Sequence, residues 1–172
     1  MPFNEDGRYL IQPMRPYRKT VKVGDVFAIK IDEDIYVHGR VILTDACWTP
    51  AGASDGLVNL IYIYGDISNA EEAFDPNGLS TSNLLTAPMM TNRLGWSRGY
   101  FLTVANVPIE SGDVLAKHVF QDTPRKVYFD EFGRPTEPSA GPVGILGAAS
   151  YRFIGDAVYR ALVERGRLPK VQ

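Results

Sequence analysis

The hydrophobic pattern near the start of the chain predicts a β-hairpin. Residues 21–31 are rich in Val, Ile and Phe and are interrupted at Gly24-Asp25, a pair that indicates a bulge or a bend. A charged turn at residues 32–34 separates this run from a second one at residues 35–43. Gly39 lies inside the second strand, where a glycine indicates a bend or the close approach of another backbone.

Four further strands are expected downstream. Residues 57–64 form the strongest of them, because apolar and aromatic side chains occupy nearly every position. The connector that follows is more polar, and Ser68 followed by Glu71 fits a capping box for a short helix over 68–73. A second short helix is expected over 82–87. The remaining strands are predicted at residues 100–107, 114–120 and 126–129, with a turn at residues 133–135.

The two ends of the chain differ in character. Residues 1–20 contain three prolines and predict an irregular lead-in. Residues 135–149 are rich in Gly, Pro and Ala and are too poor in bulky side chains to form core. A terminal helix is predicted over 150–166, with Asp156 or a residue just before it as the N-cap and Gly166 at the C′ position. Its apolar face comprises Ala157, Val158, Ala161, Leu162 and the stem of Arg165.

This order of elements predicts one domain over residues 1–172. It consists of the lead-in over 1–20, a β-rich core over 21–130 and the terminal helix over 150–166. The expected fold class is α+β, a strongly curved antiparallel sheet or partial β-barrel with a C-terminal helix. A chain of 172 residues with 45% hydrophobic residues can form a core without a metal or a disulfide framework.

Charge and composition exclude several classes of protein. The formal net charge is -2, which disfavours nucleic acid as a partner, because nucleic-acid-binding domains are usually strongly basic. The short basic cluster at residues 15–19 is better explained as a solvated part of the lead-in. No stretch approaches the ~20 apolar residues of a membrane span, and the polar N-terminus does not resemble a signal peptide. With a single cysteine, Cys47, the chain is expected to be cytoplasmic and to have no membrane partner.

Fragments of enzyme motifs occur, but each lacks its structural context. Ser54 lies in Gly-Ala-Ser-Asp-Gly, the letters of a nucleophile elbow, which requires a strand before the serine and a helix after it; here a loop precedes a strand. The glycine-rich residues 141–147 lack dinucleotide-binding spacing. His38 and His118 are expected to be half-exposed on strands, and Cys47 is expected to be a small buried hydrophobe. We therefore expect no catalytic, metal-binding or cofactor-binding residues and no cofactor.

Two acidic turns and one apolar segment are candidate partner-binding regions. Carboxylates on protruding loops can meet basic residues of a partner, although solvation explains polar turns equally well. Met and Trp are enriched in recognition surfaces, although packing of the connector onto the sheet explains them equally well. The candidates are Asp32, Glu33 and Asp34 in the hairpin turn, Glu71, Glu72 and Asp75 in the connector, and the apolar Met89, Met90 and Trp96.

Several short motifs resemble the immunity protein 26 family of bacterial polymorphic toxin systems. They are Gly24-Asp25 before an aromatic-apolar strand, Gly39-Arg40 in the next strand, Tyr64-Gly65-Asp66-Ile67, Gly95-Trp96 ahead of Tyr100-Phe101, and Gly155-Asp156. The resemblance extends over residues 21–166. It implies a scaffold in which Gly24-Asp25 sets a bulge, Phe27 fills the core, and Gly39-Arg40 bends a strand and projects a charged side chain.

The resemblance also implies a function. Such a protein binds and neutralises a cognate toxin domain, one to one, in the cytoplasm of the producing cell, and it does so without catalysis. Two alternatives come from the residues themselves. A small β-barrel module can bind a nucleic acid or a small ligand in a concave aromatic pocket around Tyr62 and Tyr64, and a hydrolase can use Ser54 or Cys47.

Overall fold

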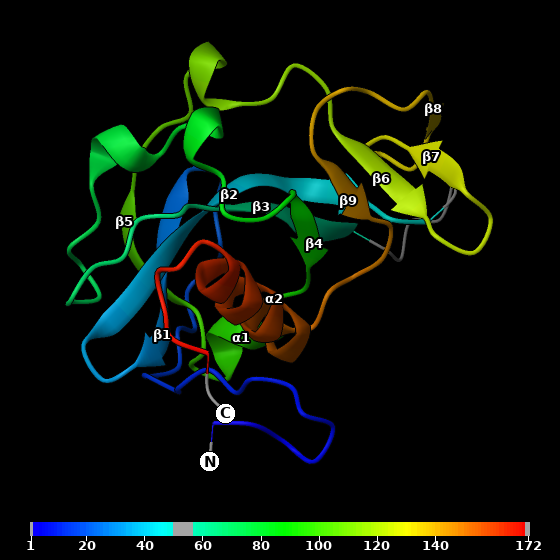
Figure 1. Ribbon diagram of the computed structural model, residues 1–172. Helices are drawn as coiled ribbons and strands as arrows, with labels where there is room; N and C mark the ends of the chain where they lie inside the picture. Colours follow the sequence, from blue (N-terminus) through cyan, green and yellow to red (C-terminus); the bar gives the residue numbers. More distant parts are fainter. Residues whose placement is uncertain (1, 50–56, 171–172) are drawn as a thin grey trace.

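The larger of two sheets has five strands in the computed structural model, which describes residues 2–49 and 57–170 (Figure 1). Its strand order is β4-β3-β2-β1-β5, and every neighbouring pair is antiparallel. The long hairpin β1–β2 therefore lies inside the sheet and not at its edge. The strands are β1 (Asp25–Asp32), β2 (Ile35–Cys47), β3 (Leu57–Ile63), β4 (Met89–Thr91) and β5 (Leu102–Asn106).

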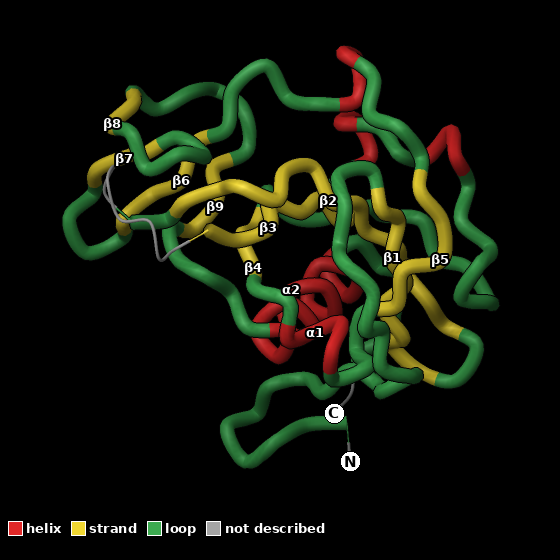
Figure 2. The backbone as a smooth tube through the Cα atoms, turned by 180° about the vertical axis from the view of Figure 1, so that it is seen from behind, coloured by secondary structure: helices red, strands yellow, loops and turns green. Residues whose placement is uncertain are grey.

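The smaller sheet has the strand order β8-β7-β6-β9, in which β9 runs parallel to β6 and the other pairs are antiparallel. It lies beyond the far end of β2, and the Cys47 N–H donates to the Glu131 carbonyl across the junction at 2.8 Å (Figures 1 and 2). Its strands are β6 (Val119–Asp122), β7 (Val127–Phe129), β8 (Pro135–Thr136) and β9 (Val143–Ile145).

Two α-helices lie on the same face of the larger sheet (Figure 2). They are α1 (Leu94–Ser97) and the terminal α2 (Tyr151–Glu164), and the described connectors contain three single 3-10 turns. Ser150 caps α2 by accepting from the Phe153 N–H at 3.1 Å. The 3-10 turns are η1 (Pro76–Gly78), η2 (Thr81–Asn83) and η3 (Ser111–Asp113).

The core has two parts because the central strands are covered on both faces. On one face, alternate residues such as Phe27 and Ile61 pack against α1 and α2. On the other face, their neighbours, such as Val26 and Leu60, pack against β6 and the long connectors. Burial on both faces explains why the sequence of β3 is nearly continuous in apolar residues and does not alternate.

The glycine-aspartate pair at residues 24 and 25 forms a turn directly before β1. Gly24 has φ of +88°, a conformation that favours glycine. The buried Asp25 carboxylate closes the turn, because it accepts from the Lys22 N–H at 2.9 Å and from the Asn106 amide at 2.9 Å. The irregular registers in β1 occur later, between Val26 and Phe27 and towards its end, so the pair is a bend and not a bulge.

Gly39 confirms the expected close approach. A Cβ atom at this position would lie 2.4 Å from Phe27 Cζ and 2.8 Å from the Tyr62 carbonyl oxygen. Both neighbours belong to the adjacent strands β1 and β3, so β2 can pack against both of them only with a glycine at this position.

The structure confirms the predicted α+β class, the first hairpin, the strand at β3 and the terminal helix. The C-terminus of α2 also ends as expected. Gly166 has φ of +68°, its N–H donates to the Val163 carbonyl, and the next N–H, of Arg167, donates to the Leu162 carbonyl. These two bonds define a Schellman motif.

The two short helices expected in the connectors were wrong. Residues 68–73 form no helix, because Ser68 pairs with Tyr36 in a β-bridge. Only the 3-10 turn η2 lies at the start of the second expected helix, and the short strand β4 follows where no strand was predicted. Residues 135–149 contain β9, whose Gly144 approaches the Pro88 carbonyl so closely that an added Cβ would lie 2.5 Å from it. Gly144 is the one buried residue of this stretch, which otherwise contributes little to the core, as expected.

The lead-in has no regular element, as expected, but it contributes to the core. Tyr9 and Ile11 are 4% exposed, and the Tyr9 ring stacks on the Tyr159 ring of α2 with centroids 4.0 Å apart. Asp156 lies within α2 and is not its cap, which was one of the predicted possibilities. Its carboxylate accepts the Tyr9 N–H at 2.7 Å and pairs with Arg160.

Candidate functional site

The structure brings the two predicted acidic turns to the same edge of the molecule. The hairpin turn at residues 32–34 directly precedes Tyr36, and Tyr36 pairs with Ser68 at the start of the acidic connector. The Glu71 carbonyl oxygen then lies 2.7 Å from the His38 Nε2 atom, which fixes the connector along the outer part of β2. We call this region the acidic edge; it comprises Asp32, Glu33, Asp34, Glu71, Glu72 and Asp75.

The carboxylates of the acidic edge differ in how they are engaged. Glu71 forms an ion pair with Arg15 at 2.7 Å, and Asp75 caps η1 by accepting from the Asn77 N–H at 2.9 Å. Glu33 and Glu72 are exposed, and their carboxylates make no hydrogen bond or ion pair within the described residues. The same holds for Asp34, so each of the two loops presents at least one carboxylate that is available for a partner.

The predicted apolar candidates occupy three different environments. Trp96 is 0% exposed and packs against Phe27 and Phe101 in the core, where its Nε1–H donates to Thr103 at 3.1 Å. Met90 is also 0% exposed. Met89 is half-buried and borders an open groove. Met90 also lines this groove, whereas Trp96 does not, so only Met89 combines partial exposure with a position at the groove.

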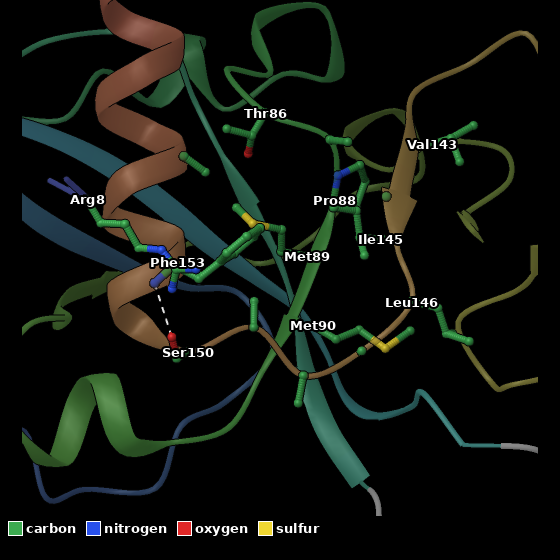
Figure 3. A pocket seen from close by; sticks show the side chains of 16 residues that line it. Arg8, Thr86, Pro88, Met89, Met90, Val143, Ile145, Leu146, Ser150 and Phe153 are labelled. Atoms are coloured by element: carbon green, nitrogen blue, oxygen red, sulfur yellow. Dashed lines mark hydrogen bonds between the residues drawn. The ribbon is translucent and has the colours of Figure 1, made fainter. Parts of the chain in front are cut away.

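This groove, which we call the apolar groove, lies between β4, β9 and the first turns of α2 (Figure 3). It has a volume of about 570 Å³, within the usual range of binding sites. Ile145 is 60% exposed and Phe153 is 39% exposed, so large apolar side chains meet solvent here. Its side chains are mainly apolar, and Arg8 is the one charged residue among the sixteen that line it.

The resemblance implied that Arg40 projects a charged side chain, but Arg40 is instead a structural cation in the interior of the protein. Its side chain is 1% exposed, and its Nη2 atom donates to the carbonyls of Val107 and Pro108 at 2.7 Å each. Nη1 pairs with Asp113 at 3.1 Å. The Glu110 N–H, and secondly Arg40, hold the pKa of Asp113 below its usual value. These partners compensate for burial of the charge and fix the β5–β6 connection onto β2.

His118, which was expected to be half-exposed, is 4% exposed and lies in a hydrogen-bonded series of buried groups. Its Nδ1 atom lies 3.3 Å from a Glu131 carboxylate oxygen, and its Nε2 atom lies 2.5 Å from the Tyr62 hydroxyl. That hydroxyl also accepts the Leu115 N–H at 3.0 Å. Burial raises the pKa of Tyr62 to about 12. The series connects the two sheets, and Tyr62, which is 0% exposed, cannot reach a substrate.

His38 is likewise 4% exposed, in contrast to the expectation. Its Nε2 atom lies 2.7 Å from the Glu71 carbonyl oxygen, so it carries the proton and donates. Burial lowers the pKa of His38, and the bond to Glu71 opposes this shift. His38 therefore holds the acidic connector in place as a neutral side chain.

The alternative sites find little support in the described residues. Cys47 is 8% exposed, as expected of a small hydrophobe, and among the described residues its sulfur has hydrogen-bond partners only in Thr49, with no base among them. Ser54 lies outside the described residues. Tyr62 and Tyr64, expected to line a concave pocket in the ligand-binding alternative, are both buried in the core.

In residues 2–49 and 57–170, no helix is both long enough and apolar enough to cross a bilayer. In the same ranges, no three His, Cys, Asp or Glu side chains gather in a way that suits a metal ion.

Sequence reasoning missed the apolar groove. Its walls come from β4, which is three residues long, and from β9, which lies in a stretch without a hydrophobic pattern. Two exposed hydrophobics, Ile145 and Phe153, were the available signal, and they stand out only once their exposure is known.

Comparison with known proteins relates these features to one family. Neither the curated proteins nor the solved structures include a match to the chain. A family comparison matches residues 22–122 to Immunity protein 26. The matched segment begins at the turn before β1 and ends with β6, so it contains the buried Arg40 and the acidic edge. Because the match extends over more than half of the 172 residues, the chain belongs to the Immunity protein 26 family.

Proposed function

We propose that this chain is an immunity protein that binds a cognate bacterial toxin domain, one to one, in the cytoplasm of the producing cell and thereby neutralises it. The observation that carries the proposal is the family match over residues 22–122. Proteins of this kind generally act without catalysis. Arg40 and His118 are paired with other groups inside the protein, which supports a structural role for both residues. Inhibition by binding is the function that fits both observations.

The acidic edge is the surface that we propose for contact with the toxin. Glu33 and Glu72 present carboxylates without a partner among the described residues, on loops that lie side by side, and a toxin that acts on nucleic acid needs a basic substrate groove. Carboxylates at the rim of such an interface would raise the association rate and favour the correct partner. Met90 and Trp96 are left out of the proposed surface because their side chains are not exposed.

The test is a protection assay in a bacterial host that expresses the toxin domain encoded by the adjacent upstream gene. Growth arrest is expected without this chain and normal growth with it. Cys47→Ala and Ser54→Ala should protect as well as the parent, because binding requires neither nucleophile. Continued arrest with a folded parent chain would contradict the immunity function. Loss of protection in either variant at unchanged expression would contradict the non-catalytic mechanism.

A further inference from the structure

The apolar groove is the largest feature of the surface that the acidic edge leaves unexplained. It lies where the edge strand of each sheet approaches the other: β4 ends the larger sheet and β9 ends the smaller one. The Ala149 N–H donates to the Met90 carbonyl at 2.7 Å and closes one side of the groove. The wall formed by β9 and α2 lies beyond the family-matched residues 22–122.

We infer that the apolar groove binds an apolar protein segment that carries a carboxylate, presented by the toxin partner. Exposure of Ile145 and Phe153 is costly in a free protein, and a hydrophobic segment would remove both from water. Met89 has a flexible side chain that can adapt to such a segment. The inference rests on the proposed function for the identity of the partner.

Charge complementarity defines the occupant more closely. Arg8 is exposed at the groove, and its guanidinium has no ion-pair partner within the described residues. None of the residues lining the groove is acidic, and the first turn of α2 has no acidic residue either. An occupant with one negative charge among apolar groups therefore matches the lining.

The few polar groups of the groove favour a protein segment over a small molecule. The Ser150 hydroxyl is already used as the cap of α2. The Thr86 hydroxyl oxygen is buried without a hydrogen-bond partner among the described residues, and an unsatisfied group of this kind is costly. A small-molecule site usually encloses most of its ligand and orients it with placed polar groups, whereas this hollow is open and offers few free polar side chains.

The first experiment tests the chemistry of the groove without the toxin. The probe is 1-anilinonaphthalene-8-sulfonate, an apolar anion whose fluorescence rises on binding, and the matched neutral probe is N-phenyl-1-naphthylamine. Arg8→Gln should weaken binding of the anion by about fivefold and leave the neutral probe within about twofold. Ile145→Ser with Phe153→Ser should weaken both probes by about fivefold or more. Equal affinity of Arg8→Gln and parent for the anion would overturn the preference for a negative charge.

The second experiment identifies the occupant by titrating the toxin domain into the same variants. The matched control is Val127→Ser, which alters a side chain that is 41% exposed on β7, away from the groove. The toxin should bind the Ile145→Ser, Phe153→Ser double variant at least about tenfold more weakly than Val127→Ser. If the parent binds the toxin and all variants bind equally, the groove inference fails while the immunity function stands. If the parent does not bind, the proposed function fails, and the occupant proposed here fails with it.

Discussion

Gly39 illustrates how a single residue supports the larger sheet. A methyl group at this position would lie within 2.4 Å of Phe27 and 2.8 Å of the Tyr62 carbonyl, and the backbone oxygen cannot move aside easily. We predict that Gly39→Ala lowers the free energy of unfolding by about 1–3 kcal/mol, the usual range for an overpacked site. The measurement is urea denaturation.

The matched control for this variant is Gly112→Ala in η3, where an added Cβ would meet nothing within 4 Å. The control should unfold at nearly the parent's urea concentration. Equal midpoints for Gly39→Ala and Gly112→Ala would show that β2 can shift to accept the methyl group.

His38 provides a pH-dependent prediction. Burial lowers its pKa in the folded state, whereas the unfolded chain binds a proton with a pKa of about 6.5. Below that pH the unfolded state holds more protons than the folded state, so stability falls as the pH is lowered through this range. His38→Gln keeps a side-chain amide near the Glu71 carbonyl and removes the titration.

The expected result is a smaller loss of stability for His38→Gln than for the parent between about pH 7.5 and about pH 5.5, by no more than about 1.4 kcal/mol per pH unit. The measurement is urea denaturation at both values. Because His118 is present in both proteins, its contribution cancels. Parallel pH profiles would contradict a buried, neutral His38.

At the level of single residues, the sequence did not predict which polar side chains are buried. Arg40 and His38 lie in strongly apolar strands, which suggested side chains that reach solvent. Their partners are carbonyls at Val107, Pro108 and Glu71, which are 33 or more residues away in the sequence and belong to irregular connectors. Cys47 was predicted correctly as buried, because a small hydrophobe needs no specific partner.

At the scale of elements, predictability followed the hydrophobic pattern more than length, since even the three-residue β7 lies within the strand predicted at residues 126–129. The hairpin, β3 and α2 were predicted because each has at least seven residues with a clear hydrophobic pattern. β4 and β9 have three residues each, and their pairing depends on neighbours brought close by the rest of the fold. The expected helix at 68–73 failed because bridge formation with Tyr36 satisfies the backbone of Ser68 instead.

The N-terminus of α2 gives a prediction at this scale. The Ser150 hydroxyl accepts the Phe153 N–H, one of the donors that a helix start leaves without an internal partner. Ser150→Ala should lower the free energy of unfolding by about 1 kcal/mol. The measurement is thermal unfolding of the variant beside the parent.

The matched control for the cap is Ser111→Ala. Ser111 is exposed in η3, and its hydroxyl makes no hydrogen bond within the described part of the chain, so the same substitution there should be nearly neutral. Equal melting temperatures for Ser150→Ala and Ser111→Ala would show that the cap contributes nothing measurable.

At the scale of the whole molecule, one scaffold carries two surfaces of opposite character. The acidic edge lies where residues 66–75 flank the first hairpin, and the apolar groove lies where the two sheets and α2 meet (Figures 1 and 3). The two acidic turns could be identified from the sequence, because carboxylates in turns are visible there, but their position side by side could not. The groove could not be identified either, since its walls assemble from segments that lie far apart in the sequence.

Reversing charges of the acidic edge tests whether these carboxylates contact the toxin or are only solvated. Glu33→Lys with Glu72→Lys removes one exposed, unpaired carboxylate from each loop without replacing either partner of the Glu71–Arg15 pair. The matched control, Asp45→Lys with Glu137→Lys, makes the same change in net charge at other exposed positions. We expect about tenfold weaker toxin binding for the first variant, mainly through slower association and less so at high salt. Equal association rates for the two variants would exclude the acidic edge from the interface.

The most direct test of the immunity function is an isothermal titration of the purified toxin domain from the adjacent gene into the parent chain. The account predicts saturable binding with one toxin per chain and a Kd well below about 1 μM, as stable specific complexes show. Absence of binding at about 10 μM of both proteins, each shown to be folded, would contradict it.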